Sequence, residues 1–256
     1  MMDDAMSPTP RIQAIAFDLD GTLVDSAPDI RHALNSALTK AGLRPFDLDA
    51  VRAWIGDGPD TLIVSALTEQ GIDPADSELR ARLRRSFDMT TLAAPLSLGT
   101  VYDGMADLMA AWQGSFAMVV VTNKPTPLAR AVLKAAQLLP YLTEVYGADT
   151  RELRKPAPGM LHAAAARLAV PPAGLLMVGD GPADLLAAQA AGCPAALVGW
   201  GYGSHAVPEG LQPWRVKTPQ QLLAGLAAQA GQAARGAQAM QAAGVAARAA
   251  QAAPAG

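Results

Sequence analysis

The stretch AIAFDLDGTLVDS, residues 14–26, joins a run of apolar residues to a group of acids. Its first four residues are apolar, which is typical of a strand buried on both faces of a parallel sheet. Asp18, Asp20 and Asp25 follow in quick succession. Burying an ionised carboxylate without a partner is costly. The chain must therefore bring a counter-charge to this point, or make use of the repulsion between the acids.

Composition limits the class of protein. The chain has 256 residues, of which 51% are hydrophobic and 17% charged, as expected for a globular protein with a well-filled core. A net charge of -3 gives no electrostatic reason to expect nucleic acid or an anionic membrane as a partner. The single cysteine excludes an internal disulfide and fits a reducing compartment, and the start MMDDAMSPTP does not resemble a secretory signal. No stretch reaches the roughly 18 apolar residues of a membrane span. We expect a cytoplasmic monomer or homodimer.

Four short apolar runs, each followed by small or polar residues, predict the strands of the sheet. They are IQAIAFD (12–18), FAMVVVTN (116–123), GLLMVGD (174–180) and PAALVGW (194–200). Helix-like segments separate them at 126–139, 157–169 and 184–192. This alternation predicts an α/β fold with a doubly wound parallel sheet, similar to a Rossmann fold.

The gap between the first two runs is too long for one crossover helix. Its amphipathic patterns indicate a helical cap inserted at 27–95, so that the catalytic core consists of 10–26 and 96–226. Within the insert, Gly56, Asp57 and Gly58 form a turn that either reaches the substrate or only connects two helices. The remaining residues, 227–256, form an Ala/Gln-rich tail with few large apolar side chains, and we expect it to be poorly ordered.

Polar residues end three of the predicted strands. In an open parallel sheet, ligands bind outside the carboxyl ends of the strands, so these residues should meet if the strands are neighbours. They are Asp18 and Asp20, Thr122 and Asn123, and Asp180, and Lys155 adds a cation in a proline-bounded loop.

Two carboxylates about 4 Å apart repel by about 4 kcal/mol at an effective dielectric of about 20, and a bound phosphate would add to this repulsion. A divalent metal could offset that charge, and carboxylate oxygens are the ligands that Mg²⁺ prefers. The acids therefore predict a Mg²⁺ site, and Mg²⁺ in turn predicts a phosphate or a similar anion as the ligand.

The D-x-D spacing adds a mechanism. Asp18 would attack phosphorus and form an aspartyl phosphate, while Asp20 would protonate the leaving oxygen and later activate water. The Thr122 hydroxyl and the Asn123 amide can donate to phosphoryl oxygens, and Lys155 can neutralise both the phosphate and Asp18. Asp184, one helical turn after Asp180, would orient that metal ligand or its waters, or would only cap a helix.

These residues carry a family resemblance. FDLDGTLVDS, VVVTN, RKP and VGDGPAD resemble, in order, the four motifs of the haloacid dehalogenase-like hydrolase superfamily, and the insert is similar to its helical cap. Within it, LTKAGL, WIGDGPDTLI and AAGCPAALVGWGYG are similar to segments of phosphoglycolate phosphatases. The resemblance implies that Asp18 is the nucleophile, Asp20 the acid and base, and Thr122 and Lys155 the phosphate-binding pair. It also implies that Asp18, Asp180 and the backbone carbonyl of Asp20 hold Mg²⁺.

The leading hypothesis is a Mg²⁺-dependent phosphatase that acts on a small phosphate monoester, above all 2-phosphoglycolate. A sugar phosphate such as N-acetylmuramate 6-phosphate is an alternative substrate, because residues of the cap decide the leaving group. A phosphosugar mutase uses the same four motifs. A 2-haloacid dehalogenase needs no metal and normally lacks the second acid, so Asp20 argues against it. A catalytically inactive binding module would be expected to have lost one of the acids, and none is missing.

Overall fold

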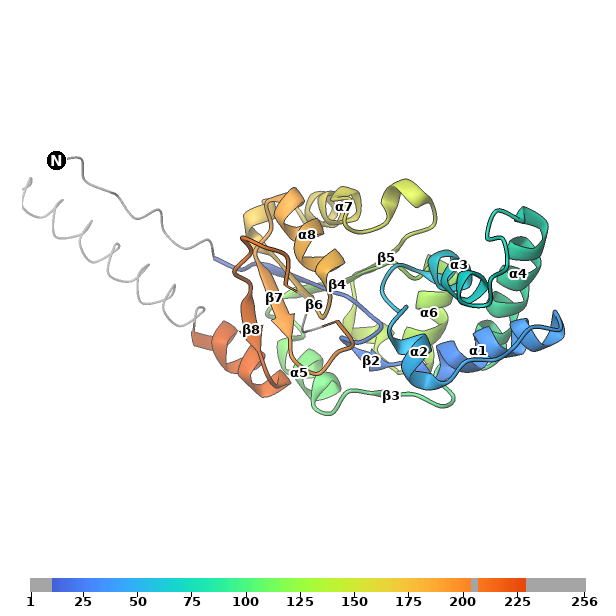
Figure 1. The fold of residues 1–256 in the computed structure, drawn as a ribbon. Helices are drawn as coiled ribbons and strands as arrows, with labels where there is room; N and C mark the ends of the chain where they lie inside the picture. The colour runs from blue at the N-terminus through green and yellow to red at the C-terminus, as the bar shows by residue number, and fades with distance from the viewer. Residues whose placement is uncertain (1–10, 204–206, 229–256) are drawn as a thin grey trace, which may run out of the picture.

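A six-stranded parallel sheet forms the centre of the molecule (Figure 1). The computed structural model describes residues 11–203 and 207–228. The strand order is β5-β4-β1-β6-β7-β8, and every neighbouring pair is parallel. The strands are β1 (Ala14–Phe17), β4 (Ala117–Thr122), β5 (Glu144–Gly147), β6 (Leu175–Gly179), β7 (Ala195–Val198) and β8 (Trp214–Val216).

The four apolar runs are all strands, and β1 lies between β4 and β6. The sequence did not predict β5 or β8. In β5 the half-buried Glu144 and Tyr146 alternate with buried residues, so the segment lacks a continuous apolar run. β8 is only three residues long. The predicted doubly wound α/β class is confirmed.

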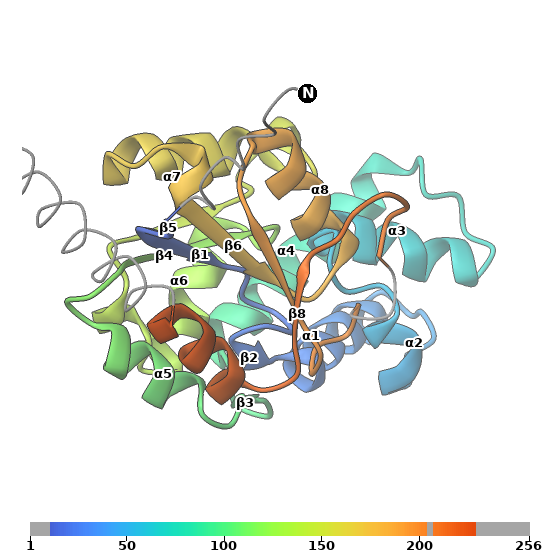
Figure 2. The same cartoon turned by 90° about the vertical axis from the view of Figure 1, so that its left-hand side faces the viewer.

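Alternate residues of β1 face two separate hydrophobic clusters. Ile15 and Phe17 belong to the cluster that includes α5 (Met105–Trp112), α6 (Thr126–Ala135) and the helical residues 219–228. Ala14 and Ala16 belong to the cluster that includes α7 (Gly159–Leu168) and α8 (Pro182–Ala191). Figure 2 shows α7 and α8 on one side of the sheet and α5 on the other. Helices thus cover both faces and bury the central strand completely, as a parallel sheet requires.

Four further helices, called here the four-helix unit, lie between two short strands. The strands β2 (Val24–Asp25) and β3 (Thr100–Val101) pair antiparallel, so the chain leaves and re-enters the sheet domain side by side. The helices are α1 (Ala27–Lys40), α2 (Leu48–Arg52), α3 (Pro59–Glu69) and α4 (Ser77–Ala93). They bury a third hydrophobic cluster of their own, to which Leu128 of α6 also belongs. All four fall within the range predicted for the cap.

Three 3-10 turns complete the described elements: η1 (Leu139–Tyr141), η2 (Arg151–Leu153) and η3 (Pro172–Gly174). In the part of the chain that the structure describes, no helix is long and apolar enough to cross a membrane. The predicted poorly ordered tail falls almost entirely on residues 229–256, which lie outside the described residues.

Candidate active site

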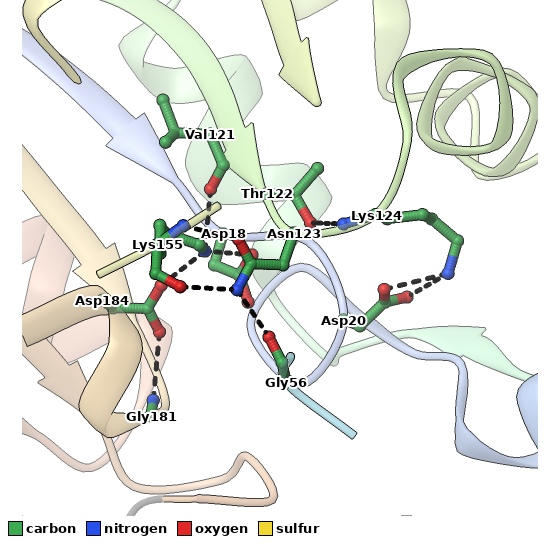
Figure 3. A network of polar contacts seen from close by, with 10 residues as sticks. All are labelled: Asp18, Asp20, Gly56, Val121, Thr122, Asn123, Lys124, Lys155, Gly181 and Asp184. Atoms are coloured by element: carbon green, nitrogen blue, oxygen red, sulfur yellow. Dashed lines mark hydrogen bonds and ion pairs between the residues drawn. The ribbon is translucent and has the colours of Figure 1, made fainter. Parts of the chain in front are cut away.

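The predicted site residues lie at the carboxyl ends of three neighbouring strands (Figure 3). Asp18 follows β1, Thr122 ends β4, and Asp180 follows β6. Lys155 reaches the same place from the loop after η2. Each of these four residues is at least nine-tenths buried. The parallel sheet therefore brings together residues that are far apart in the sequence.

A tight turn after β1 separates the two acids of the D-x-D motif. The carbonyl of Leu19 accepts hydrogen bonds from the backbone N–H groups of Thr22, Leu23 and Val24, at 2.9 to 3.3 Å. Gly21 has a φ of +87°, a conformation that a residue with a side chain rarely adopts. Asp18 thus lies beside Lys155, whereas Asp20 turns toward Lys124 (Figure 3).

Lys155 is the buried cation next to Asp18. Its Nζ donates to Asp18 Oδ1 at 2.7 Å, to Asp184 Oδ1 at 2.6 Å and to the carbonyl of Val121 at 2.9 Å. These bonds account for all three ammonium hydrogens. Burial favours the neutral amine, but Asp18 and Asp184 outweigh that effect and hold the pKa of Lys155 above its ordinary value. Lys155 therefore stays charged.

The acids around Lys155 are not fully compensated by it. Burial raises the pKa of Asp18 to about 7, against the pull of Lys155 and with the help of Asp184 and Asp180. Burial and Asp184 raise the pKa of Asp180 to about 6, although the backbone N–H groups of Gly203 and Tyr202 oppose this. One lysine thus faces three carboxylates, and protons are held more tightly than in water.

The three carboxylates fit a hard divalent cation. Oxygen atoms of Asp18, Asp180 and Asp184 all lie within 4.8 Å of one another. Asp180 is fixed by hydrogen bonds to its Oδ2 from the backbone N–H groups of Tyr202 at 2.6 Å and Gly203 at 3.1 Å. A Cβ atom at Gly21 or Gly201 would collide with Asp180, so the chain leaves room there only for this carboxylate. Asp18 and Asp180 are the predicted side-chain ligands in this group, and Asp184 is a third candidate.

Asp184 lies in the first turn of α8 and contacts both the start of that helix and Lys155, the second of which the sequence did not predict. Its Oδ2 accepts the backbone N–H of Gly181 at 3.0 Å and so satisfies a donor at the start of α8. Its Oδ1 accepts from Lys155 at 2.6 Å. The side chain is only 3% exposed, and a Cβ atom at Gly179 would collide with it.

Thr122 and Asn123 are placed differently from each other. The Thr122 oxygen accepts the backbone N–H of Lys124 at 3.2 Å, which leaves its hydroxyl hydrogen available to a ligand. The amide of Asn123 accepts from the N–H of Lys155 at 2.8 Å, and it donates to the carbonyls of Gly56 at 2.9 Å and Lys155 at 3.2 Å. The amide therefore holds two loops together, and it would have to break one of these bonds to reach a phosphoryl oxygen.

The sequence did not single out Lys124, which forms the second ion pair of the site. Its Nζ donates to both oxygens of Asp20 at 2.9 Å, and the side chain is 6% exposed. Ser26, which directly precedes α1, also donates to Asp20. The signal for Lys124 was a cation directly after a predicted strand end, in VVVTNKP.

A small cavity joins Asp18 and Asp20 to the four-helix unit. Its volume is about 40 Å³, and Gly56 and Gly58 contribute to its lining. Gly56 is also the residue whose carbonyl accepts from Asn123. The Gly56–Gly58 turn therefore links α2 to α3 and also reaches the site. The sequence had left open whether it does more than connect the two helices.

Comparison with known proteins agrees with this geometry. The model of the haloacid dehalogenase-like hydrolase family matches residues 12–192. A phosphoglycolate phosphatase of Rhodospirillum rubrum is 38% identical over 200 residues, which cover 76% of this chain and 83% of that protein. The phosphoglycolate phosphatase of Escherichia coli strain K12 is 36% identical over 208 residues, which cover 75% and 82%.

A solved structure shows the same fold. The crystal structure of a predicted phosphoglycolate phosphatase from Haemophilus somnus has a TM-score of 0.75 and 28% identity, covering 83% of this chain and 96% of that one. With the family match, this fold and its acids define a hydrolase whose site lies at the carboxyl ends of a parallel sheet. The chain belongs to the haloacid dehalogenase-like hydrolase family. The resemblance seen in the four motifs is confirmed, and the relatives support the predicted class, a phosphoric monoester hydrolase.

The raised pKa values predict how a divalent cation stabilises the fold. The pKa values of Asp18 and Asp180 in the folded chain, about 7 and about 6, lie above their ordinary value of 3.8, so stability without a cation falls as the pH rises from about 4 to about 7. A cation binds the ionised acids and offsets that loss. We expect Mg²⁺ to raise the melting temperature more at pH 8 than at pH 5, and Asp180→Asn to reduce the rise at pH 8. An equal rise at both pH values, or one unchanged in Asp180→Asn, would contradict this assignment.

Proposed function

We propose that this hydrolase is a Mg²⁺-dependent phosphatase that cleaves a small phosphate monoester, above all 2-phosphoglycolate, through an aspartyl-phosphate intermediate. The observation that carries the proposal is the position of Asp18. Its carboxylate lies against the buried ammonium group of Lys155 and beside Asp180 and Asp184, where an incoming anion would meet both a cation and a nucleophile. The names of the curated relatives support phosphoglycolate as the substrate.

Asp18, Asp180 and the backbone carbonyl of Asp20 would hold the metal. When bound, Mg²⁺ would neutralise the carboxylates and the phosphoryl oxygens, which otherwise repel each other. Asp184 keeps Lys155 in place through its bond of 2.6 Å.

The first half of the reaction transfers the phosphoryl group to the protein. An oxygen of Asp18 attacks phosphorus, and the bond between phosphorus and the ester oxygen breaks. Asp20 gives its proton to that ester oxygen, so the alcohol leaves as a neutral product. The hydroxyl of Thr122 donates to a phosphoryl oxygen during the transfer. The ammonium group of Lys155 does the same with the hydrogen that its bond to Asp18 releases when Asp18 attacks phosphorus.

The second half returns Asp18 to its starting state. Asp20, which has lost its proton, takes one from a water molecule, and the resulting hydroxide attacks phosphorus. The bond between phosphorus and Asp18 breaks, and inorganic phosphate leaves. The turn after β1 serves both halves, because it keeps Asp20 out of the bonds that hold Asp18.

The four-helix unit would act as the cap over this site. Gly56 already touches the core through Asn123, and residues of α3 and α4 line the cavity beside Asp20. A volume of about 40 Å³ holds a few water molecules, since one water needs about 10–15 Å³. The residues of the four-helix unit that line this cavity would therefore contact the leaving group.

Phosphate release on a panel of esters tests the proposal. The panel contains 2-phosphoglycolate, N-acetylmuramate 6-phosphate and glucose 1-phosphate, each with Mg²⁺ and with a chelator. We expect release to be greatest on 2-phosphoglycolate, to stop with the chelator, and to fall about 10⁴-fold in Asp18→Asn, as for a lost nucleophile. Asp107→Asn, which changes an exposed acid on α5, is the matched control and should keep full activity. A folded protein that releases phosphate from none of these esters would refute the proposal.

Substrates with different leaving groups can separate the two proposed tasks of Asp20, protonation of the leaving oxygen and activation of water. Nitrophenolate leaves without a proton, so Asp20→Asn should still form the aspartyl phosphate from p-nitrophenyl phosphate but hydrolyse it slowly. Rapid-quench kinetics should show a burst of nitrophenolate followed by a steady rate about 10²- to 10⁴-fold below that of the wild type. On 2-phosphoglycolate the burst should disappear. If Asp20→Asn slows the burst and the steady rate equally on p-nitrophenyl phosphate, Asp20 does not have both tasks.

A further inference from the structure

The cavity beside Asp20 has walls of two kinds. Its outer wall is apolar and comes from the four-helix unit and α6: Ile30, Trp54, Ile55, Pro59, Leu62, Phe87 and Leu128. Its inner wall carries the reacting acids and the polar end of β4. Among the described residues that line it, Lys124 is the one with a positive charge. A leaving group that entered this space would meet hydrocarbon on one side and an ammonium group on the other.

Lys124 is held next to the place where the leaving group of the proposed reaction would lie. Its backbone N–H donates to the Thr122 hydroxyl oxygen, and its Nζ lies 2.9 Å from each oxygen of Asp20 (Figure 3). With phosphorus against Asp18, the proposed reaction requires the ester oxygen to lie next to Asp20. The first atoms beyond the ester oxygen then lie within reach of Lys124.

The ammonium group has a donor to spare for a ligand. It carries three hydrogens, and the two bonds to Asp20 use two of them. Two arginines near the four-helix unit are engaged elsewhere, since Arg84 and Arg154 both donate to Asp60, which lines a different pocket. A carboxylate buried against the apolar wall would be costly without a partner, and Lys124 is the partner that the cavity offers.

We propose that Lys124 binds a carboxylate on the leaving group, so that the site selects phosphate monoesters with an acid group one carbon from the ester oxygen. This inference rests on the proposed phosphatase function and names the feature of the substrate that the site recognises. The carboxylate shares the ammonium group with Asp20. An ester with a neutral group at that position leaves the third hydrogen of Lys124 without an anionic partner.

Two esters of nearly equal size test the inference. They are 2-phosphoglycolate and 2-hydroxyethyl phosphate, which replaces the carboxylate by a neutral CH₂OH group. We expect the ratio of their kcat/KM values to fall by about 10- to 100-fold in Lys124→Gln, the range for a hydrogen bond to a charged group. Any disturbance of Asp20 acts on both esters and cancels in the ratio. Lys124→Arg should keep part of the preference, and Lys134→Gln, at an exposed lysine of α6, should keep all of it.

Binding gives a second readout that does not depend on turnover. In the Asp18→Asn variant, calorimetry should show tighter binding of 2-phosphoglycolate than of 2-hydroxyethyl phosphate, and adding Lys124→Gln should remove most of that difference. Hydrolysis of both esters with a ratio unchanged by Lys124→Gln would overturn the inference and leave the phosphatase function standing. Release from neither ester by the wild-type protein would overturn both.

Discussion

The double ion pair of Lys155 with Asp18 and Asp184 is the interaction on which the site depends. It is almost completely buried, so removing Lys155 would leave the carboxylates without a cation, and breaking a buried pair in this way typically costs about 3–5 kcal/mol. The pair can form only because β1, β4 and β6 are neighbours and end at one edge of the sheet. The fold therefore serves the chemistry directly, because the strand order places a nucleophile, a cation and the metal-binding acids together.

The second ion pair, between Lys124 and Asp20, explains why the chain uses two lysines for two acids. Asp18 and Asp20 pair with different lysines, and the turn around the Leu19 carbonyl keeps these two acids apart. Asp18 can then be positioned for attack on phosphorus while Asp20 faces the four-helix unit, where the leaving group would lie. A single shared lysine would couple the two acids and make their roles harder to separate.

Much of the fold and site could be predicted because the signals were local. Continuous apolar runs marked the four central strands, and Asp18 and Asp180 followed two of those runs directly. β5 was missed because its half-buried Glu144 interrupts the apolar pattern. Lys124 was missed because its partner Asp20 lies 104 residues earlier, and the direction of a long side chain cannot be read from its place in the chain. The bonds of the Asn123 amide to Gly56 and Lys155 depend equally on how distant loops meet.

The central claim is that the carboxylate of Asp18 accepts the phosphoryl group. Borohydride reduces an acyl phosphate but not a free carboxylate, so it converts a phosphorylated aspartate to homoserine. Protein quenched during turnover of 2-phosphoglycolate with Mg²⁺ would be reduced, digested and examined by mass spectrometry. The account predicts homoserine at position 18, and none when the substrate is omitted or a chelator is present. Homoserine at position 20 instead, or an unmodified Asp18 throughout active turnover, would contradict it.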